Sequence, residues 1–523
     1  MMNKKTLFSL LSLSVVMILA GHLSTFMAGK SLGYSPEIVP FVRNILIILM
    51  LFLVGVYFVF QRYRGDYSLF VTMFLLIGIG LTVQYGIESR ERSYKKIVTT
   101  SGTEPKEEQQ AEIEAETLIT MVVVDSLAVN YVEDLVLISE GPGPEETAES
   151  RLSVGGIISD FAENRPVWQR LFFQYGLAFA GMIFIVMVFS RDPNVLIRRY
   201  YLWALLTIVS FAIFAILSSS GKYGGMFFYG MTPWEFYKIS FVVILAGYFS
   251  ENREAFQRFK TLLPIPPIIA LGPLLVIYFI PLSFLLFLKD FGQLLLYAVF
   301  VIILLYAVTK RFSYLFFSLA AIGILTAIIL IAGDYLPGSF NHIYRRFATF
   351  IDFWNGFPAA AESLTRMEQN PEYVLWRRQT WQTLNGFFAV NAGGIFGTGI
   401  GFGMPTLVPL VANDFVYAAI AEEWGIIGSA LVLGLYLMLI LSGVKIAGRT
   451  SSDFLRFLVY GFTIMFTLQV IINIGGVINL LPMTGVTLPF LSKGGFSLMT
   501  NIWIVGFLMA ISHYVEINRK EEY

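Results

Sequence analysis

Long apolar runs separated by polar connections dominate the chain. A helix that crosses a bilayer needs about 20 mostly apolar residues, and twelve segments approach or exceed this length. They cover residues 6–28, 42–61, 68–88, 168–190, 199–219, 233–249, 263–283, 291–309, 313–333, 415–443, 455–477 and 496–515. The pattern therefore predicts an all-α polytopic membrane protein with about twelve transmembrane helices.

Basic residues cluster in every second connection between these segments. They are Lys4 and Lys5, Arg62 and Arg64, Arg191, Arg198 and Arg199, Arg253, Arg258 and Lys260, Lys310 and Arg311, Lys445 and Arg449, and Arg519 and Lys520. Short loops rich in Lys and Arg stay in the cytoplasm. An even number of spans with both termini in the cytoplasm satisfies all of these clusters.

The first apolar segment also has features of a signal peptide. Lys4 and Lys5 precede the apolar core, and the small residues Ala28 and Gly29 follow it. The apolar run is long for a signal peptide, so a retained helix is favoured. Cleavage is the alternative, and it would change the number of spans but not the rest of the topology.

Composition supports a membrane protein and excludes several kinds of site. Hydrophobic residues make up 56% of the 523 residues and charged residues 14%, whereas soluble domains carry about 25% charged residues. The formal net charge of zero gives no reason to expect a nucleic-acid partner. The chain has no Cys and only three His, which excludes disulfides and thiolate metal sites and argues against a histidine-built metal cage.

Two long segments, 89–167 and 334–414, fall outside the membrane in this topology. The first contains the acidic run "EPKEEQQAEIEAE", which is typical of a solvated helix, followed by an apolar stretch and the turn-rich "SEGPGPEETAES". The second contains Trp354, Trp376, Trp381 and several Arg residues. Loops of this length are usually functional or disordered, and the aromatic and basic content of the second argues against disorder.

Charged residues at membrane depth are the first candidates for chemistry, because each costs roughly 2.5–3.5 kcal/mol to insert. Asp290 lies in "FLKDFGQLLL", between two apolar runs. A loop that surfaces at the interface and tolerates both Lys289 and Asp290 is the alternative. Glu235 and Lys238 are three residues apart on one predicted helix, and an ion pair that only neutralises two costly charges is the alternative to a functional role.

Further polar residues fall at the same, outer side of the predicted bundle. They are Arg346, Asp414, Glu422, Glu423 and Lys493. Adjacent glutamates on a helix point about 100° apart, so one cavity is expected to receive at most one of them. Lys493 lies in "LPMTGVTLPFLSKGGFSL", which is too rich in Pro and Gly for a spanning helix. Such backbone is tolerated at membrane depth only where it lines protein or water.

This gathering of acids and bases suits a lipid-phosphate substrate handled on the outer face. Arg and Lys bind phosphate, and a carboxylate can act as a general base. The run "GGIFGTGIGFG" resembles a nucleotide loop only superficially, because no strand precedes it. Its glycines are expected to allow a tight loop or a close backbone approach, and neither a nucleotide nor a redox cofactor is expected.

Seven motifs in register resemble the SEDS family (shape, elongation, division and sporulation), the RodA/FtsW/SpoVE type of peptidoglycan glycosyltransferase. The matching segments are "LLIGIGLTVQYGIES", "TPWEFYKISFVVILAGY", "LKDFGQLLL", "RFATFIDFW", "QTLNGFFAVNAGGIFGTGIG", "VPLVANDFVYAAIAEEWGIIG" and "NIGGVINLLPMTGVTLPFLSKGGFSL". The resemblance covers residues 68–515 and ten spans. It implies two additional N-terminal helices in 1–67, an enlarged extracytoplasmic loop at 89–167, a second large loop at 334–414 and a cytoplasmic tail at 516–523.

The resemblance implies a specific activity, polymerisation of lipid II on the outer face of the cytoplasmic membrane for cell shape or division. Asp290 matches the essential acid of the family, the general base that activates the acceptor hydroxyl, and the anomeric configuration inverts. The leaving pyrophosphate needs positive charge from Lys, Arg or a divalent cation such as Mg²⁺ or Mn²⁺. Substrate-binding candidates are Glu235, Lys238, Arg346, Gln382, Asp414, Glu422, Glu423, Ser492 and Lys493. Implied partners are lipid II, a class B penicillin-binding protein and other elongasome or divisome membrane proteins.

The chain also departs from the family pattern near the implied substrate cavity. Lys289 replaces a Pro before Asp290, Leu410 and Ala412 replace a Glu and a His, and Lys493 replaces a Tyr. A cation beside Asp290 would lower the pKa of its carboxyl unless Lys289 points away. These changes indicate a different substrate or partner, or a drift in activity.

Two other functions remain alternatives to the polymerase. A flippase or transporter of a lipid-linked precursor would need paired charges deep in the bundle and broken helices in both halves, whereas the charges here gather near one face. A non-catalytic scaffold for a penicillin-binding protein would have no reason to keep an isolated acid such as Asp290. A related outcome is glycosyl transfer from a polyprenyl-linked donor to another acceptor.

Overall fold

The structure is a computed structural model of the full chain. It describes residues 4–32, 38–60, 63–101, 167–198, 200–205, 207, 233–254, 282–283, 285, 290–332, 344, 346–355, 371–493 and 495–521. Within these ranges the regular structure is helical, and no strand occurs. The predicted all-α class therefore holds for the described part of the chain.

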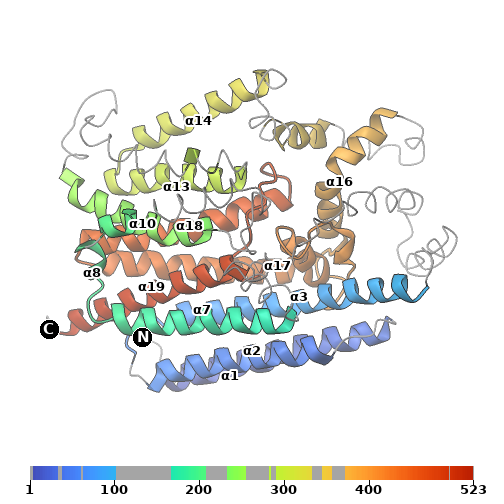
Figure 1. Cartoon of the computed structure of the whole chain (residues 1–523), viewed down its shortest axis with the longest axis horizontal. Helices are drawn as coiled ribbons and strands as arrows, with labels where there is room; N and C mark the ends of the chain where they lie inside the picture. The colour runs from blue at the N-terminus through green and yellow to red at the C-terminus, as the bar shows by residue number, and fades with distance from the viewer. Residues whose placement is uncertain are drawn as a thin grey trace, which may run out of the picture.

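Most of the long helices lie side by side along one direction and form the body of the molecule (Figure 1). They are α1 (Lys4–Ser31), α2 (Ile38–Phe60), α3 (Ser68–Ser101), α7 (Val167–Phe189), α10 (Pro233–Glu251), α13 (Phe291–Thr309), α14 (Phe312–Ala332), α17 (Val416–Arg449), α18 (Asp453–Val477) and α19 (Gly495–Glu521). A further helix, α16 (Pro371–Ala392), runs steeply across this direction. Two short elements, α8 (Val195–Arg198) and the 3-10 turn η5 (Pro405–Leu407), join them.

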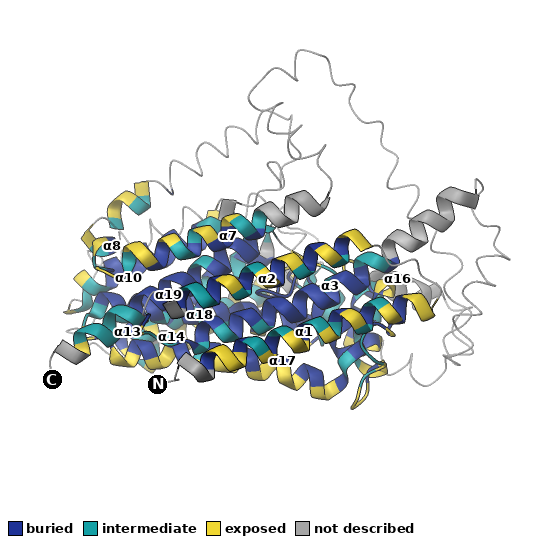
Figure 2. Cartoon of the chain, turned by 90° about the horizontal axis from the view of Figure 1, so that it is seen from below, coloured by how far each residue is buried: buried dark blue, intermediate teal, exposed yellow. Residues whose placement is uncertain are grey.

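Buried residues concentrate on α3, α18 and α19, which lie at the centre of the bundle (Figure 2). α18 packs against α10, α13 and α17, and α19 packs against α7. α1 and α2 form an outer layer against α3, with many apolar side chains exposed on their far sides. Exposed Leu, Ile and Phe on outer helices suit a surface that faces lipid rather than water.

Seven of the described helices are long and apolar enough to cross a membrane. They are Leu7–Ser31, Ile38–Phe58, Ser68–Arg90, Gly292–Thr309, Val416–Arg449, Asp453–Val477 and Gly495–Arg519. Helices also occupy the predicted spans in α7, α10 and α14. Most of the predicted span 199–219 and nearly all of 263–283 lie outside the described residues, so the count of twelve and the cytoplasmic termini stay predictions.

Several helices run further than the apolar pattern predicts. α3 continues through the polar "SRERSYKKIVTT" to Ser101, and α17 and α19 extend to Arg449 and Glu521. Hydropathy marks only the apolar part of a helix, whereas the hydrogen-bonded helix can continue into polar sequence made of ordinary helix-forming residues. α16, in the second long segment, was not predicted as a helix, because that segment lacks a clear apolar period.

The first helix is an integral part of the bundle. His22 of α1 contacts the Thr82 hydroxyl of α3 at 2.8 Å through Nδ1 and the Asn44 amide of α2 at 3.3 Å through Nε2. These three side chains are buried. Polar contacts of this kind hold membrane helices together, and they support the expectation of a retained helix. Most of loop 89–167 lies outside the described residues.

Candidate active site at the start of helix α13

Asp290 lies immediately before α13 and caps its N-terminus. Its Oδ1 accepts a hydrogen bond from the Gln293 backbone N–H at 3.1 Å, and its own N–H donates to the Leu285 carbonyl at 3.1 Å. Free N–H groups and the helix dipole both favour a negative charge at this position. The side chain is thus held at the end of an apolar helix by the fold, and it is only partly exposed.

A close backbone approach brings the Pro- and Gly-rich segment 478–493 against the first turn of α13, beside Asp290. A Cβ on Gly292 would lie 2.3 Å from the Thr484 carbonyl oxygen, so only glycine permits this contact. Segment 478–493 is non-helical, as predicted, and it is held inside the bundle by side chains. The Asn473 amide donates to the Val486 carbonyl at 2.7 Å, and the Gln84 amide donates to the Leu491 carbonyl at 3.1 Å.

Glu235 and Lys238 of α10 lie on the buried side of this site. Their side chains form an ion pair at 2.6 Å, with Lys238 fully buried. The Gln293 amide donates to the other Glu235 oxygen at 3.3 Å, and the Thr500 hydroxyl of α19 lies 3.5 Å from Oε2. The ion pair expected as the alternative role is therefore present. The same carboxylate also links α10 to α13 and α19, directly behind Asp290.

Arg346 and Asp414 complete the charged cluster from outside the long helices. The Arg346 guanidinium donates to the Met483 carbonyl at 2.9 Å, and its charge acts on both Asp290 and Asp414. The Asp414 carbonyl accepts from the Asn473 amide at 2.8 Å. Asp414 Oδ1 is buried and has no hydrogen-bond partner among the described residues. The charge of one guanidinium therefore acts on two carboxylates, and one of these has an acceptor oxygen without a partner among the described residues.

Burial sets the ionisation of this cluster. It raises the pKa of the Asp290 carboxyl above its ordinary value, and the nearby Glu235 charge adds to the rise, while the Gln293 N–H, Arg346 and Lys238 oppose it. Burial likewise raises the pKa of Asp414, against the effect of Arg346. It lowers the pKa of Arg346, although both carboxylates favour the charged guanidinium. A carboxylate with a raised pKa is a better proton acceptor at neutral pH.

Helix α17 is broken at Gly425, just after the glutamate pair. Gly425 has φ 65° and ψ −164°, which interrupts the helix hydrogen bonds. The glycine-rich loop 393–403 replaces them. Thr398 and Gly399 N–H groups donate to the Glu422 and Glu423 carbonyls at 2.9 and 3.0 Å, and the Ile426 N–H donates to the Gly394 carbonyl at 2.9 Å. The glycines thus allow a close backbone approach, as predicted.

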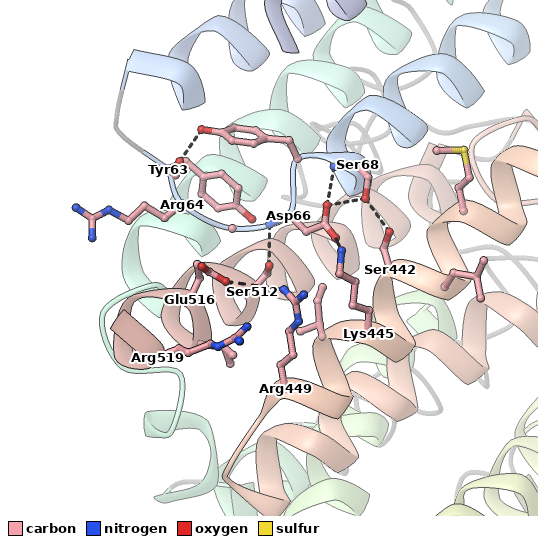
Figure 3. Close-up of a pocket in the computed structure, with 16 residues that line it drawn as sticks. Tyr63, Arg64, Asp66, Ser68, Ser442, Lys445, Arg449, Ser512, Glu516 and Arg519 are labelled. Carbon is pink, nitrogen blue, oxygen red and sulfur yellow. Dashed lines mark hydrogen bonds and ion pairs between the residues drawn. The ribbon is translucent and has the colours of Figure 1, made fainter. Parts of the chain in front are cut away.

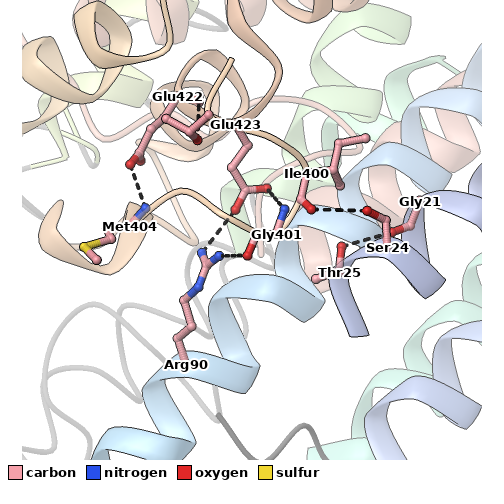
Figure 4. Close-up of polar contacts among 10 residues, drawn as sticks. Gly21, Ser24, Thr25, Arg90, Ile400, Gly401, Met404, Glu422 and Glu423 are labelled. Carbon is pink, nitrogen blue, oxygen red and sulfur yellow. Dashed lines mark hydrogen bonds and ion pairs between the residues drawn. The ribbon is translucent and has the colours of Figure 1, made fainter. Parts of the chain in front are cut away.

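The side chains of Glu422 and Glu423 hold different parts of this loop (Figure 4). Glu422 Oε1 accepts from the Met404 N–H at 2.6 Å. Glu423 accepts from the Gly401 N–H at 3.1 Å and pairs with Arg90 of α3 at 3.1 Å. The two carboxylates therefore have different hydrogen-bond partners, although both side chains lie against Gly403. Both are occupied with loop and helix contacts rather than joined to the Asp290 cluster.

The remaining predicted residues lie away from Asp290. The Gln382 amide of α16 donates to the Pro409 carbonyl at 3.2 Å, and the Ser492 hydroxyl accepts from the Leu488 N–H at 2.8 Å. Lys493 is exposed and lines a cavity of about 60 Å³ with Arg43 and Glu88, which form an ion pair at 3.0 Å. Lys289, expected to influence Asp290, lies outside the described residues.

Sequence reasoning missed three residues that build the site. Gln293 and Thr500 bind Glu235, and Arg90 pairs with Glu423. Gln293 could have been predicted, because the side chain of the residue three positions after an N-cap commonly points back towards the cap. Arg90 gave no usable signal, because it lies in a charged run that resembles a solvated surface.

A dedicated metal cage is not formed by the described residues. Within those ranges, no three His, Asp or Glu side chains lie close enough together to hold a metal ion. The expected divalent cation therefore stays an untested prediction.

The chain matches the family model described as "Cell cycle protein" (FtsW/RodA/SpoVE) over residues 152–517, more than half of its length. It is 32% identical over 342 residues to "Peptidoglycan glycosyltransferase RodA" of Mycobacterium tuberculosis (strain ATCC 25618 / H37Rv), which covers 63% of this chain and 67% of that protein. It is 27% identical over 348 residues to "Stage V sporulation protein E" of Bacillus subtilis (strain 168), which covers 65% of this chain and 86% of that protein.

A solved structure supports the same fold. The structure, described as "Structural coordination of polymerization and crosslinking by a peptidoglycan synthase complex", superposes with a TM-score of 0.50 at 20% sequence identity. The match covers 70% of this chain and 94% of the solved one. On the family match, the relatives and the shared helical fold, this multi-pass membrane protein belongs to the FtsW/RodA/SpoVE family, the SEDS proteins.

Proposed function

We propose that this protein polymerises peptidoglycan glycan strands from lipid II on the outer face of the bacterial cytoplasmic membrane. The supporting observation is the position of Asp290, a half-buried carboxylate with a raised pKa beside a cation and a non-helical segment. The relatives named peptidoglycan glycosyltransferase point to the same reaction class.

In the proposed reaction, Asp290 accepts the proton of an acceptor sugar hydroxyl. The hydroxyl oxygen attacks the anomeric carbon of the donor as the bond to the polyprenyl pyrophosphate breaks, which inverts the configuration. The electron pair of that bond leaves with the pyrophosphate, and the proton stays on Asp290 until solvent removes it. General-base catalysis of this kind contributes roughly 10²–10⁴-fold to a rate.

Arg346 is the best-placed cation for the leaving pyrophosphate. One guanidinium nitrogen is bound to the Met483 carbonyl, and Arg has further donors that suit phosphate oxygens. Lys238 is less suited to direct contact, because it is fully buried and paired with Glu235. We assign Glu235 and Lys238 to positioning α10 and α13 behind Asp290.

A class B penicillin-binding protein is the proposed partner. The solved neighbour is described as a peptidoglycan synthase complex that coordinates polymerisation and crosslinking. A chain with the same fold and family can use a similar arrangement, in which the partner crosslinks the glycan that this protein makes. Loop 89–167 is the proposed docking element, and most of it lies outside the described residues.

The direct test is polymerisation of labelled lipid II by the purified full-length protein with its class B partner. We expect long glycan strands and free polyprenyl pyrophosphate. Release of unpolymerised lipid II across vesicles without strand formation would favour a flippase instead. No product under conditions in which the partner crosslinks added glycan would favour a scaffold.

A further inference from the structure

A large cavity opens at the end of the bundle opposite the candidate active site. It has a volume of about 880 Å³ and lies between the loop 63–67, the C-terminal half of α17 and the C-terminal part of α19. α17 begins two residues after Asp414, is 34 residues long and ends at Arg449. Because a helix rises about 1.5 Å per residue, the cavity and the Asp290 cluster lie at opposite membrane surfaces.

The cavity has fixed walls. The Tyr63 hydroxyl donates to the Met509 carbonyl at 2.9 Å, the Arg64 N–H donates to His513 at 2.8 Å, and the Asp66 N–H donates to the Ser512 hydroxyl at 2.8 Å. The Ser68 and Ser442 hydroxyls join α3 to α17 at 2.7 Å. The loop is therefore tied to both helices that carry the charged side chains of the cavity.

Positive charge predominates in the cavity. Four basic and two acidic side chains line it, an excess of two positive charges. Lys445, Arg449 and Arg519 come from α17 and α19, and Arg64 extends away from them (Figure 3). One oxygen of Asp66 is already bound to the Ser68 N–H and hydroxyl at 3.0 and 2.7 Å.

The basic side chains of the cavity have N–H groups that are available to bind a ligand. Lys445 lies 3.8 Å from Asp66, and Arg449 lies 3.8 Å from Glu516. Charge-assisted hydrogen bonds to a carboxylate are about 2.7–2.9 Å long, so these are loose pairs without a hydrogen bond. In the part of the chain that the structure describes, no hydrogen bond is recorded from the side chains of Lys445, Arg449 and Arg519.

An apolar strip leads from the membrane into this basic region along α17. Met438 and Leu441 line the cavity with side chains 50% and 57% exposed, and Lys445 and Arg449 follow on the same helix face. Acyl chains on the apolar part and a phosphate at the basic end match this order. A soluble anion would use only the basic end and would leave the apolar strip uncovered.

We propose that this cavity binds an anionic membrane phospholipid, with its phosphate between Lys445, Arg449 and Arg519 and an acyl chain along Met438 and Leu441. The lipid would stabilise the junction of α17, α19 and the loop 63–67. This site is separate from the proposed lipid II site, and its occupancy does not depend on catalysis.

Thermal unfolding of the purified full-length protein in detergent tests this proposal without any substrate. Added phosphatidylglycerol should raise the midpoint of unfolding more than phosphatidylcholine or inorganic phosphate at equal concentration. In the variant Lys445→Gln/Arg449→Gln, affinity for phosphatidylglycerol should fall about thirtyfold, because each basic side chain near an anionic lipid contributes on the order of fivefold. Arg198→Gln, at an exposed arginine loosely paired with Asp192, is the matched control and should retain the shift.

Two outcomes would overturn the proposal. An equal shift with inorganic phosphate would show a general anion site, and an unchanged shift in the double variant would place the lipid elsewhere. If the double variant does not fold, native mass spectrometry of Arg519→Gln replaces it. Loss of the phosphatidylglycerol adduct would then support the site, and an unchanged adduct would contradict it.

Discussion

Asp290 combines two requirements that rarely coincide at one residue. It must be buried enough for its pKa to rise, yet it must reach a substrate from the end of an apolar helix. The helix N-terminus provides the Gln293 N–H for the ionised form, and Arg346 and Lys238 limit the rise in pKa. Glu235 acts in the opposite direction, and its pairing with Lys238 reduces that effect.

The raised pKa of Asp290 predicts an acid limb in the pH dependence of polymerisation. A base with a raised pKa is protonated, and inactive, at a pH where a free aspartate is still ionised. The rate should therefore fall with decreasing pH while the pH is still above 3.8, the ordinary value for this carboxyl. Arg346→Gln removes a cation that lowers this pKa, so its acid limb should lie at higher pH. Rates measured across pH check both expectations, and a limb that moves to lower pH contradicts them.

Because Glu235 and Lys238 are buried and paired, we expect the effect of replacing one on the free energy of unfolding to depend strongly on whether the other is also replaced. Lys238→Met leaves a buried carboxylate without its cation, which should lower the free energy of unfolding by about 3 kcal/mol. Glu235→Gln/Lys238→Met removes both charges and should recover much of the loss. Unfolding in detergent measures these changes. Arg456→Met is the control, because its pair with Asp453 has the same spacing but is partly exposed, and it should cost about 1 kcal/mol or less. Equal losses in Lys238→Met and Arg456→Met would contradict the account.

Among the elements, α17 is a helix interrupted at Gly425, and the loop 393–403 forms hydrogen bonds with its backbone around the interruption. The sequence predicted the span, because hydropathy is a local property of the chain, and the glycines indicated a tight loop or a close backbone approach without naming the partner. It did not predict the break, because Gly425 also fits a continuous helix. The interruption depends on hydrogen bonds from Thr398 and Gly399, which are more than twenty residues away along the chain, so the local sequence does not reveal it.

Because the loop 393–403 binds the interrupted part of α17, we expect an Ala substitution at Gly397 to impair the protein and an Ala substitution at Gly434 to be tolerated. A Cβ at Gly397 would lie 2.2 Å from the Glu423 carbonyl oxygen, and its φ of 82° is also strained for alanine. Gly397→Ala should displace the loop and reduce both thermal stability and polymerisation. Gly434→Ala, on α17 with no atom within 4 Å of the new Cβ, should match the wild type or exceed its stability slightly. Thermal unfolding and the polymerisation assay compare the two variants, and equal behaviour would contradict this role for the loop.

At the scale of the whole molecule, the two N-terminal helices join the rest of the bundle at several points. α1 and α2 meet α3 through His22 and Asn44, and the Ser24 hydroxyl of α1 donates to the Ile400 carbonyl at 3.4 Å (Figure 4). Hydropathy predicted these helices, but their neighbours could not be deduced, because lipid-facing and protein-facing apolar residues look alike in sequence. The motifs contain most residues of the Asp290 cluster. The contacts of Gln293 and Thr500 with Glu235 depend on how α10, α13 and α19 pack, and the sequence alone does not show that packing.

The packing of α1 predicts that it is retained in the mature protein. Ala28, the small residue expected near a signal-peptide cleavage site, is 1% exposed within a helix that continues to Ser31. A protease needs an exposed and extended segment, which this site does not offer in the folded bundle. Intact mass spectrometry of the purified protein should find a chain that includes α1. A mass that corresponds to cleavage after Ala28 would show that the helix is removed.

The central claim is that Asp290 accepts the proton during glycan polymerisation, and one comparison tests it most directly. Wild type, Asp290→Asn and the surface control Asp192→Asn are each purified with the class B partner and supplied with labelled lipid II. The account predicts long strands from the wild type and from Asp192→Asn, and a rate at least about 100-fold lower from a folded Asp290→Asn variant. Equal polymer from Asp290→Asn and the wild type would contradict the account and return Asp290 to the role of an interfacial helix cap.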